Sequence, residues 1–124
     1  MIQHIIDRFQ EIKPKLLKKF EKEQPSSYED ILVQTLNTMY DPEDEIYNIP
    51  DVSNLTTLNH GDYQGTLVFI MPENVYLPNK YYIVKVFYGS CSECDTFYSY
   101  AEMKNSAPHM VTLALHMMEA MKEI

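Results

Sequence analysis

Apolar residues near the start of the chain recur at steps of three and four positions, the spacing of an amphipathic helix. The stripe consists of Ile2, Ile5, Ile6, Phe9, Ile12, Leu16, Leu17 and Phe20. Lysines occupy the opposite face, and Pro14 lies inside the stripe, where a proline removes a backbone donor and crowds the preceding turn. We therefore predict a helix that packs on the core and is kinked or split near Lys13.

A second helical pattern follows Pro25. Ser26 and Glu29 have the spacing of a capping box, in which each side chain satisfies a backbone N–H at the start of a helix. The apolar positions that follow are Tyr28, Ile31, Leu32, Leu36 and Met39. We predict a helix over residues 27–40, followed by an acidic loop over residues 41–57.

The hydrophobic period then changes from that of a helix to that of strands. Continuous apolar and β-branched runs cover Thr66–Met71 and Tyr81–Tyr88, and a shorter run covers Leu55–His60. Gly61 and Gly65 bracket the connection between Leu55–His60 and Thr66–Met71, where a turn or bulge is expected. The pattern predicts an antiparallel meander of about three strands.

A last helix is expected near the C-terminus. Ser106-Ala107-Pro108 supplies a cap and an early proline ahead of an apolar segment, Met110–Ile124, whose apolar face is wide enough to be buried on more than one side. The predicted fold is α+β: two N-terminal helices, a three-stranded or slightly larger meander, and a C-terminal helix packed on it. We expect one domain over residues 1–124, with a helical part (1–40), the acidic loop (41–57) and the remainder (58–124).

Composition adds a charge asymmetry to this picture. The chain has 124 residues, a net charge of -8 and 45% hydrophobic residues, which suits one globular core. Six of its ten basic residues lie in the first 22 positions, whereas residues 23–79 contain ten acids and no Lys or Arg. This disfavours binding of the acidic segment to duplex nucleic acid, and the segment is expected to face a protein partner with a basic surface, or simply water.

The predicted partner-binding residues follow from this asymmetry. They are Glu43, Asp44, Glu45, Asp51, Asp62 and Tyr63. No apolar run approaches the roughly 20 residues that cross a bilayer, and the first residues do not resemble a signal peptide. We therefore expect a cytoplasmic protein without a membrane partner, and we leave its oligomeric state open.

Cys91 and Cys94 form a C-x-x-C pair, the sharpest candidate for chemistry in the sequence. Two thiolates at this spacing can hold one zinc ion, and His60, then His116, are the candidates for a third ligand. A redox role is the second interpretation, although the neighbouring acids Glu93 and Asp95 disfavour a thiolate. Two buried or loop cysteines without chemistry are the third interpretation, and it is the one that we favour. A stable disulfide is not expected in a reducing compartment.

Three segments carry a resemblance: GDYQGTLVFI, YYIVKVFYGSCSECDTF and TLALHMMEAMK. Together they resemble a set of small uncharacterised proteins of bacteriophages and large viruses that share a GDYQG turn and a YGSCSxCDT loop. The resemblance implies shared positions but no activity. Those positions are Gly61, Asp62, Tyr63, Gly65, Tyr88, Gly89, Ser90, Cys91, Cys94, Asp95 and His116. Glu93 departs from the pattern, which favours a small residue there.

Two functional hypotheses follow from the sequence. It contains no Walker loop, no G-x-G-x-x-G, no nucleophile elbow and no H-E-x-x-H. The first hypothesis is therefore a phage- or virus-encoded accessory protein that binds and inhibits or modulates a host protein, in host takeover or anti-defence. The alternative is a metal-binding or thiol-dependent enzyme centred on the C-x-x-C loop.

Overall fold

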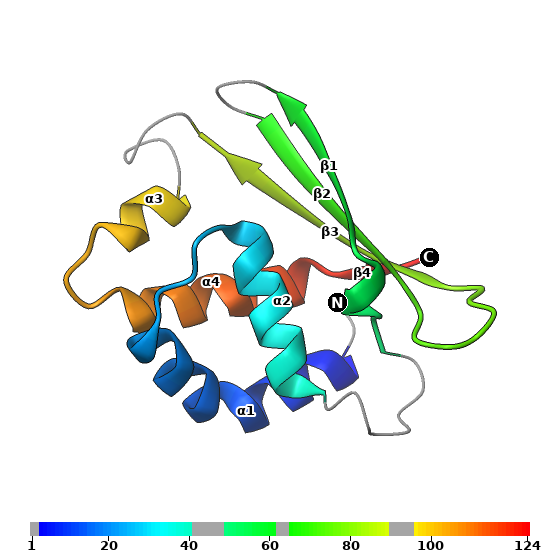
Figure 1. The fold of residues 1–124 in the computed structure, drawn as a ribbon, viewed down its shortest axis with the longest axis horizontal. Coiled ribbons are helices and arrows are strands. Elements are labelled where there is room, and N and C mark those ends of the chain that lie inside the picture. The colour runs from blue at the N-terminus through cyan, green and yellow to red at the C-terminus, as the bar shows by residue number, and fades with distance from the viewer. Residues whose placement is uncertain (1–2, 41–48, 62–64, 90–95) are drawn as a thin grey trace.

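The structure, a computed structural model, describes residues 3–40, 49–61, 65–89 and 96–124. Within these ranges the chain has an α+β fold with four α-helices and a four-stranded antiparallel sheet (Figure 1). The helices are α1 (Gln3–Lys22), α2 (Tyr28–Met39), α3 (Thr96–Ala101) and α4 (Ser106–Ala120), with a short 3-10 helix η1 (Val52–Asn54). The strands are β1 (Thr56–Gly61), β2 (Gly65–Pro72), β3 (Tyr81–Tyr88) and β4 (Lys122–Glu123), in the order β1-β2-β3-β4.

Helix α1 buries the stripe that the sequence predicts. Its buried residues are Ile5, Phe9, Ile12, Leu16 and Phe20. The lysines of the opposite face are exposed to solvent. Contrary to the expected split near Lys13, the helix continues through Pro14 to Lys22.

The cap of α2 lies one residue later than predicted. Ser27, not Ser26, is the N-cap, and its hydroxyl accepts a hydrogen bond from the backbone N–H of Asp30 at 3.1 Å. The Asp30 carboxylate in turn accepts from the backbone N–H of Ser26 at 2.8 Å. Asp30 therefore replaces Glu29 in the capping interaction. The Glu29 carboxylate instead accepts a hydrogen bond from Thr57, which ties the start of α2 to β1.

The β1–β2 hairpin has a glycine on each side of its connection. The strands pair from Thr56 with Ile70 to Gly61 with Gly65. Gly61 has a positive φ, a conformation that favours glycine. At Gly65, a Cβ would lie 2.0 Å from the carbonyl oxygen of His60, so a larger residue does not fit without a shift of the backbone. These two glycines fix where the hairpin turns.

The C-terminus differs from the predicted continuous helix. Helix α4 begins at Ser106 and ends at Ala120. The expected cap at Ser106 is wrong, because Asn105 is the N-cap and its side chain makes no capping hydrogen bond. The chain then extends as β4 beside the start of β3, where Tyr81 and Ile124 exchange backbone hydrogen bonds of 2.7 and 2.8 Å. Helix α3 was also not predicted.

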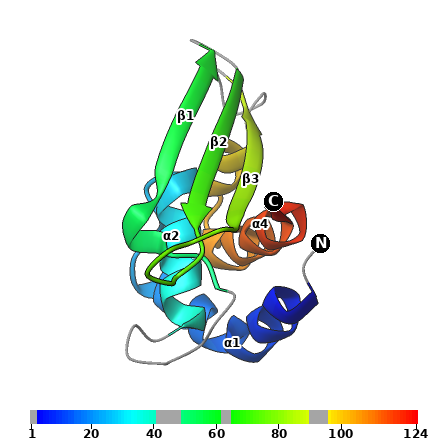
Figure 2. The ribbon, with the colours of Figure 1, turned by 90° about the vertical axis from the view of Figure 1, so that its right-hand side faces the viewer.

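The helices cover one face of the sheet, with α4 between α1 and the strands. Helix α4 contacts α1, α2, α3 and β3, which confirms that its apolar face is buried on more than one side. The sheet face that meets these helices, the inner face, contributes Phe69, Met71, Tyr82 and Val84, each completely buried. In Figure 2 the strands β1, β2 and β3 stand in front of α2, with α1 below them, and no α-helix lies over the face of the sheet that is seen.

Candidate functional site

Most of the predicted partner-binding residues lie outside the described part of the chain. Glu43, Asp44, Glu45, Asp62 and Tyr63 belong to this group. Their role stays a prediction.

Asp51 is described, and its carboxylate caps η1. It accepts hydrogen bonds from the backbone N–H of Ser53 (3.1 Å), from the Ser53 hydroxyl (2.6 Å) and from the Asn54 side chain (2.7 Å). Partial burial raises the pKa of Asp51, but these hydrogen bonds outweigh burial and hold the pKa below its usual value. Asp51 is therefore ionised at neutral pH and engaged in local structure.

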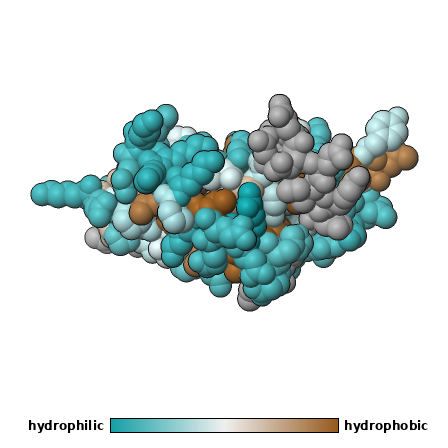
Figure 3. Space-filling view, turned by 90° about the horizontal axis from the view of Figure 1, so that it is seen from below, coloured by the Kyte–Doolittle hydropathy of each residue, from teal (hydrophilic) through white to brown (hydrophobic). Residues whose placement is uncertain are grey.

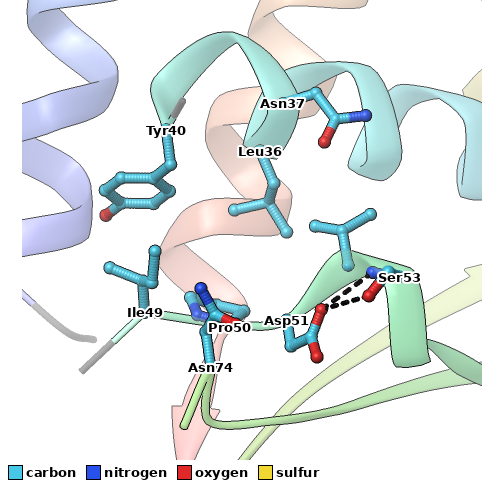
Figure 4. A pocket seen from close by; sticks show the side chains of 9 residues that line it. Leu36, Asn37, Tyr40, Ile49, Pro50, Asp51, Ser53 and Asn74 are labelled. Carbon is cyan, nitrogen blue, oxygen red and sulfur yellow. Dashed lines mark hydrogen bonds between the residues drawn. The ribbon is translucent and has the colours of Figure 1, made fainter. Parts of the chain in front are cut away.

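A small cavity lies beside this cap, between the end of α2 and η1 (Figure 4). Its volume is about 200 Å³. The lining residues are Leu36, Asn37, Tyr40, Ile49, Pro50, Asp51, Val52, Ser53 and Asn74. The Asp51 carboxylate points to Ser53 (Figure 4). The cavity is smaller than ordinary ligand pockets, and we do not assign a substrate to it.

Only two of the four predicted metal ligands, His60 and His116, lie within the described residues. Cys91 and Cys94 lie outside that part of the chain. His60 is exposed on β1, and His116 is exposed on α4, in the helical part of the molecule. The described residues contain no group of three or more His, Cys, Asp or Glu side chains that could hold a metal ion.

The most distinctive surface is the face of the sheet opposite the helices, which we call the outer face. Residues paired across antiparallel strands project to the same side, so the register defines this face row by row. From the hairpin end, the rows are His60–Thr66–Phe87, Leu58–Val68–Lys85, Thr56–Ile70–Ile83–Lys122 and Pro72–Tyr81–Ile124. No helix of the described chain packs against these rows (Figure 2).

The outer face is apolar at its centre. Ile70 of β2 pairs with Ile83 of β3, Val68 lies two positions away on β2, and all three are only half-buried. Around them Phe87 is 80% exposed, and Leu58 and Tyr81 are each 43% exposed. Solvated faces of antiparallel sheets are normally polar, which gives the strands an alternating pattern. Here both faces of β2 and β3 are apolar, but within the described part of the chain only the inner face is covered by helices.

The charge of the outer face is opposite to that of the whole chain. Its rows contain Lys85 and Lys122, both exposed, and none of the chain's 18 acidic residues. Within the described residues neither lysine forms an ion pair. Glu123 lies at the same end of the sheet, but it pairs in register with Tyr82 and so belongs to the inner face. Its carboxylate lies 3.1 Å from the ammonium group of Lys80.

Two buried polar groups lie between the inner face and the helices: the hydroxyl of Tyr82 on β3 and that of Tyr40 at the end of α2. Neither has a hydrogen-bond partner among the described residues. Burial raises the pKa of both, and for Tyr82, with the added effect of the Glu123 and Glu73 carboxylates, to about 12. Both phenols are neutral at physiological pH.

The outer face was not identified from the sequence, although the strands carry a signal for it. In YYIVKVFY, apolar residues occupy consecutive positions, so both faces of the strand are apolar. The single charge, Lys85, falls on the set of positions that also contains Ile83 and Phe87. The few helices of this fold can cover only one face of the sheet. Lys85 lies on the face that they leave uncovered.

Comparisons with family models, curated proteins and solved structures find no match for this chain. In the described part of the chain, no helix combines the length and the apolar character that crossing a bilayer requires.

Proposed function

We propose that this chain is a small accessory protein, encoded by a phage or virus, that binds a host protein and inhibits or modulates it. The GDYQG and YGSCSxCDT segments support the viral origin through their resemblance to phage and virus proteins. The outer face of the sheet supports the binding role and replaces the acidic loop as our choice of contact surface. Exposed contiguous apolar patches on small proteins commonly mark interaction sites.

The size of the outer face indicates what kind of ligand it holds. Strands about 4.8 Å apart and rows about 6.7 Å apart give it an area of roughly 300 Å². A standard protein–protein interface buries about 800 Å² on each partner. The outer face therefore fits a short segment of a partner. Because β1 is an edge strand with all six residues exposed, an extended segment can lie beside it and over the rows.

The charge of the outer face indicates the chemistry of that segment. A ligand with apolar side chains and nearby carboxylates complements the apolar centre and the ammonium groups of Lys85 and Lys122. A second copy of this chain is a poorer occupant, because two outer faces in symmetric contact bring lysines together with no carboxylate on either face. The net charge of -8 on each copy adds to this repulsion.

Selection from a random peptide display library tests this proposal. The wild-type protein is the target, and we expect the selected peptides to alternate apolar residues with Asp or Glu. Phe87→Asp removes the most exposed apolar side chain of the outer face and adds a like charge, so the dissociation constant of a selected peptide should rise at least about tenfold. Lys85→Glu should weaken binding as well.

Leu77→Asp is the matched control. Leu77 is 80% exposed, as Phe87 is, but it lies in the β2–β3 connection and outside the rows. It should leave peptide affinity unchanged. Equal loss in the two variants, or a selected consensus rich in Lys and Arg, would overturn the assignment of the outer face. Self-association that Phe87→Asp abolishes would identify a second copy as the occupant.

The same pair of variants extends the test to the host. A host protein held by the wild type and by Leu77→Asp but not by Phe87→Asp is then purified, and its affinity is measured directly. If no host protein distinguishes the two variants, the host-binding role fails, even where peptides bind the outer face.

A further inference from the structure

A groove with four lysines lies between α1 and the C-terminal end of α2, away from the outer face. We call it the lysine groove, and its volume is about 620 Å³. The lining residues are Lys15, Lys18, Lys19, Glu21, Lys22, Asn37 and Thr38. In the view from below, onto the side of the molecule where α1 lies, hydrophilic side chains predominate (Figure 3). The groove holds four of the ten basic residues of an acidic chain.

The lysines of this groove are close to one another, and among the described residues Glu21 is the one acidic side chain in the lining. Residues three and four positions apart are neighbours on a helix, and like charges at these spacings oppose helix formation. The helix dipole stabilises the positive charges of Lys19 and Lys22, which lie in the last turn of α1. It does not stabilise those of Lys15 and Lys18, which lie further from that end. Among the described residues, none of the four forms an ion pair. Glu21, three positions after Lys18, offsets only part of the repulsion among four lysines, and an anion in the groove would relieve the remainder.

Helix α2 holds one of these ammonium groups in place. Thr38 donates its hydroxyl proton to the carbonyl of Gln34 at 2.7 Å, so its oxygen is left to accept a hydrogen bond from Lys19 at 3.3 Å. The exposed Asn37 amide is a neutral hydrogen-bond donor at the same wall of the groove. The ammonium group of Lys19 on α1 and the amide of Asn37 on α2 thus line the same groove.

We propose that the lysine groove binds a small molecule with several phosphate groups. Lysine ammonium groups suit phosphate oxygens as point charges, whereas planar recognition of carboxylates favours arginine, which does not line this groove. The volume lies in the usual range for small-molecule sites, roughly 300–1,000 Å³. This inference is independent of the proposed role of the outer face.

Long polyanions fit the groove less well than a compact ligand. Lys15 and Lys22 are seven positions apart on α1, so the cationic surface extends over only about two turns of the helix. A longer chain of phosphates would reach beyond it to the rest of a molecule of net charge -8. The described residues that line the groove include no aromatic side chain to stack with bases, as sites for single-stranded nucleic acid require.

Calorimetric titration of the full chain with inorganic triphosphate tests the proposal. We expect binding that weakens as salt increases, and weaker binding of inorganic phosphate, which has fewer charges. Lys18→Gln combined with Lys22→Gln should lower the affinity for triphosphate about tenfold. Lys13→Gln combined with Lys104→Gln is the matched control, because both lysines are exposed, lie outside the groove and change the net charge equally.

Four results would overturn the proposal. One is the absence of triphosphate binding, and another is an equal loss of affinity in the groove and control variants, which indicates general charge attraction. The other two are tighter binding of a single-stranded oligonucleotide, or of vesicles containing anionic lipid, than of triphosphate. Unfolding midpoints of both double variants, which change only exposed side chains, establish that the fold is retained.

Discussion

The two faces of the sheet have similar side chains and opposite surroundings. On the inner face, Phe69 and Val84 are completely buried against the helices. On the outer face of the same strands, Ile83 is half-buried and Phe87 is 80% exposed. Folding explains the apolar residues of the inner face, because their burial drives it. It does not explain those of the outer face, which stay in contact with water.

If the outer face binds a partner as proposed, this difference separates stability from function within single strands. Alternate residues of β3 belong to different faces, so neighbours in the sequence have different roles. Substitutions on the inner face should act mainly on the free energy of unfolding, and those on the outer face mainly on binding.

The largest expected effect is the contrast between two phenylalanines. Phe69→Ala should lower the free energy of unfolding by about 3–5 kcal/mol, because it leaves a cavity in a filled core. Phe87→Ala should change it only slightly, as surface substitutions usually do, because the side chain is mostly in water. Urea unfolding of the two variants provides the measurement. Similar losses would show that Phe87 is buried by another part of the chain.

The hairpin provides the next test, because its register decides which residues belong to each face. Gly65→Ala brings a Cβ against the His60 carbonyl oxygen and should cost about 1–3 kcal/mol. Thr66→Ala, at the next position of β2, should cost clearly less, because Thr66 is on the outer face. Urea unfolding again measures both changes, and equal costs would contradict the close approach at Gly65.

A smaller effect is expected at Tyr82, a polar residue of the inner face. Its hydroxyl lacks a partner in the described chain, so Tyr82→Phe should preserve stability near neutral pH or raise it by up to about 1 kcal/mol. The pKa of Tyr82 is raised in the folded state to about 12, above the unfolded value near 10. Ionisation of Tyr82 therefore leaves the free energy of unfolding unaffected below pH 10 and lowers it as the pH rises from 10 to 12.

Denaturant unfolding over that alkaline interval checks the direction of this change in the free energy of unfolding. The wild type should lose stability more steeply between pH 10 and 12 than Tyr82→Phe does. Parallel pH profiles for the two proteins would place the Tyr82 hydroxyl in contact with solvent.

The smallest expected effect concerns the acidic segment. Changing Glu43, Glu45, Asp44 and Asp51 to their amides should leave the affinity for outer-face peptides unchanged in fluorescence anisotropy. A marked loss would return the contact surface to the acidic residues that the sequence suggested. Asn at position 51 retains an oxygen that can accept from Ser53, so η1 should persist in this variant.

Local patterns predicted much of the fold. The stripe of α1, the strands of the meander and the glycines of the hairpin all depend on residues close in sequence, and the structure contains them. The predicted end of the last helix was wrong. Lys122 and Glu123 have good helix propensity, yet they form a strand because they pair with β3. Such pairing joins residues about 40 positions apart and has no local signal.

The candidate site was harder to predict, because it depends on which face the helices leave open. The apolar runs of β2 and β3 are equally consistent with burial on both sides. Only the packing of α4 against β3 shows that one face is covered, and only the register places Leu58 and Phe87 on the other. The predicted zinc site stays a prediction, since Cys91 and Cys94 lie outside the described residues.

Amide NMR of the isotope-labelled protein, titrated with a selected peptide, tests the central claim most directly. If the outer face binds the peptide, the largest chemical-shift changes will occur in β1, β2 and β3, at Leu58, Val68, Ile83 and Phe87, and they will disappear in Phe87→Asp. Changes concentrated in residues 41–51 or along the lysine groove, with the outer-face amides unmoved, would contradict it.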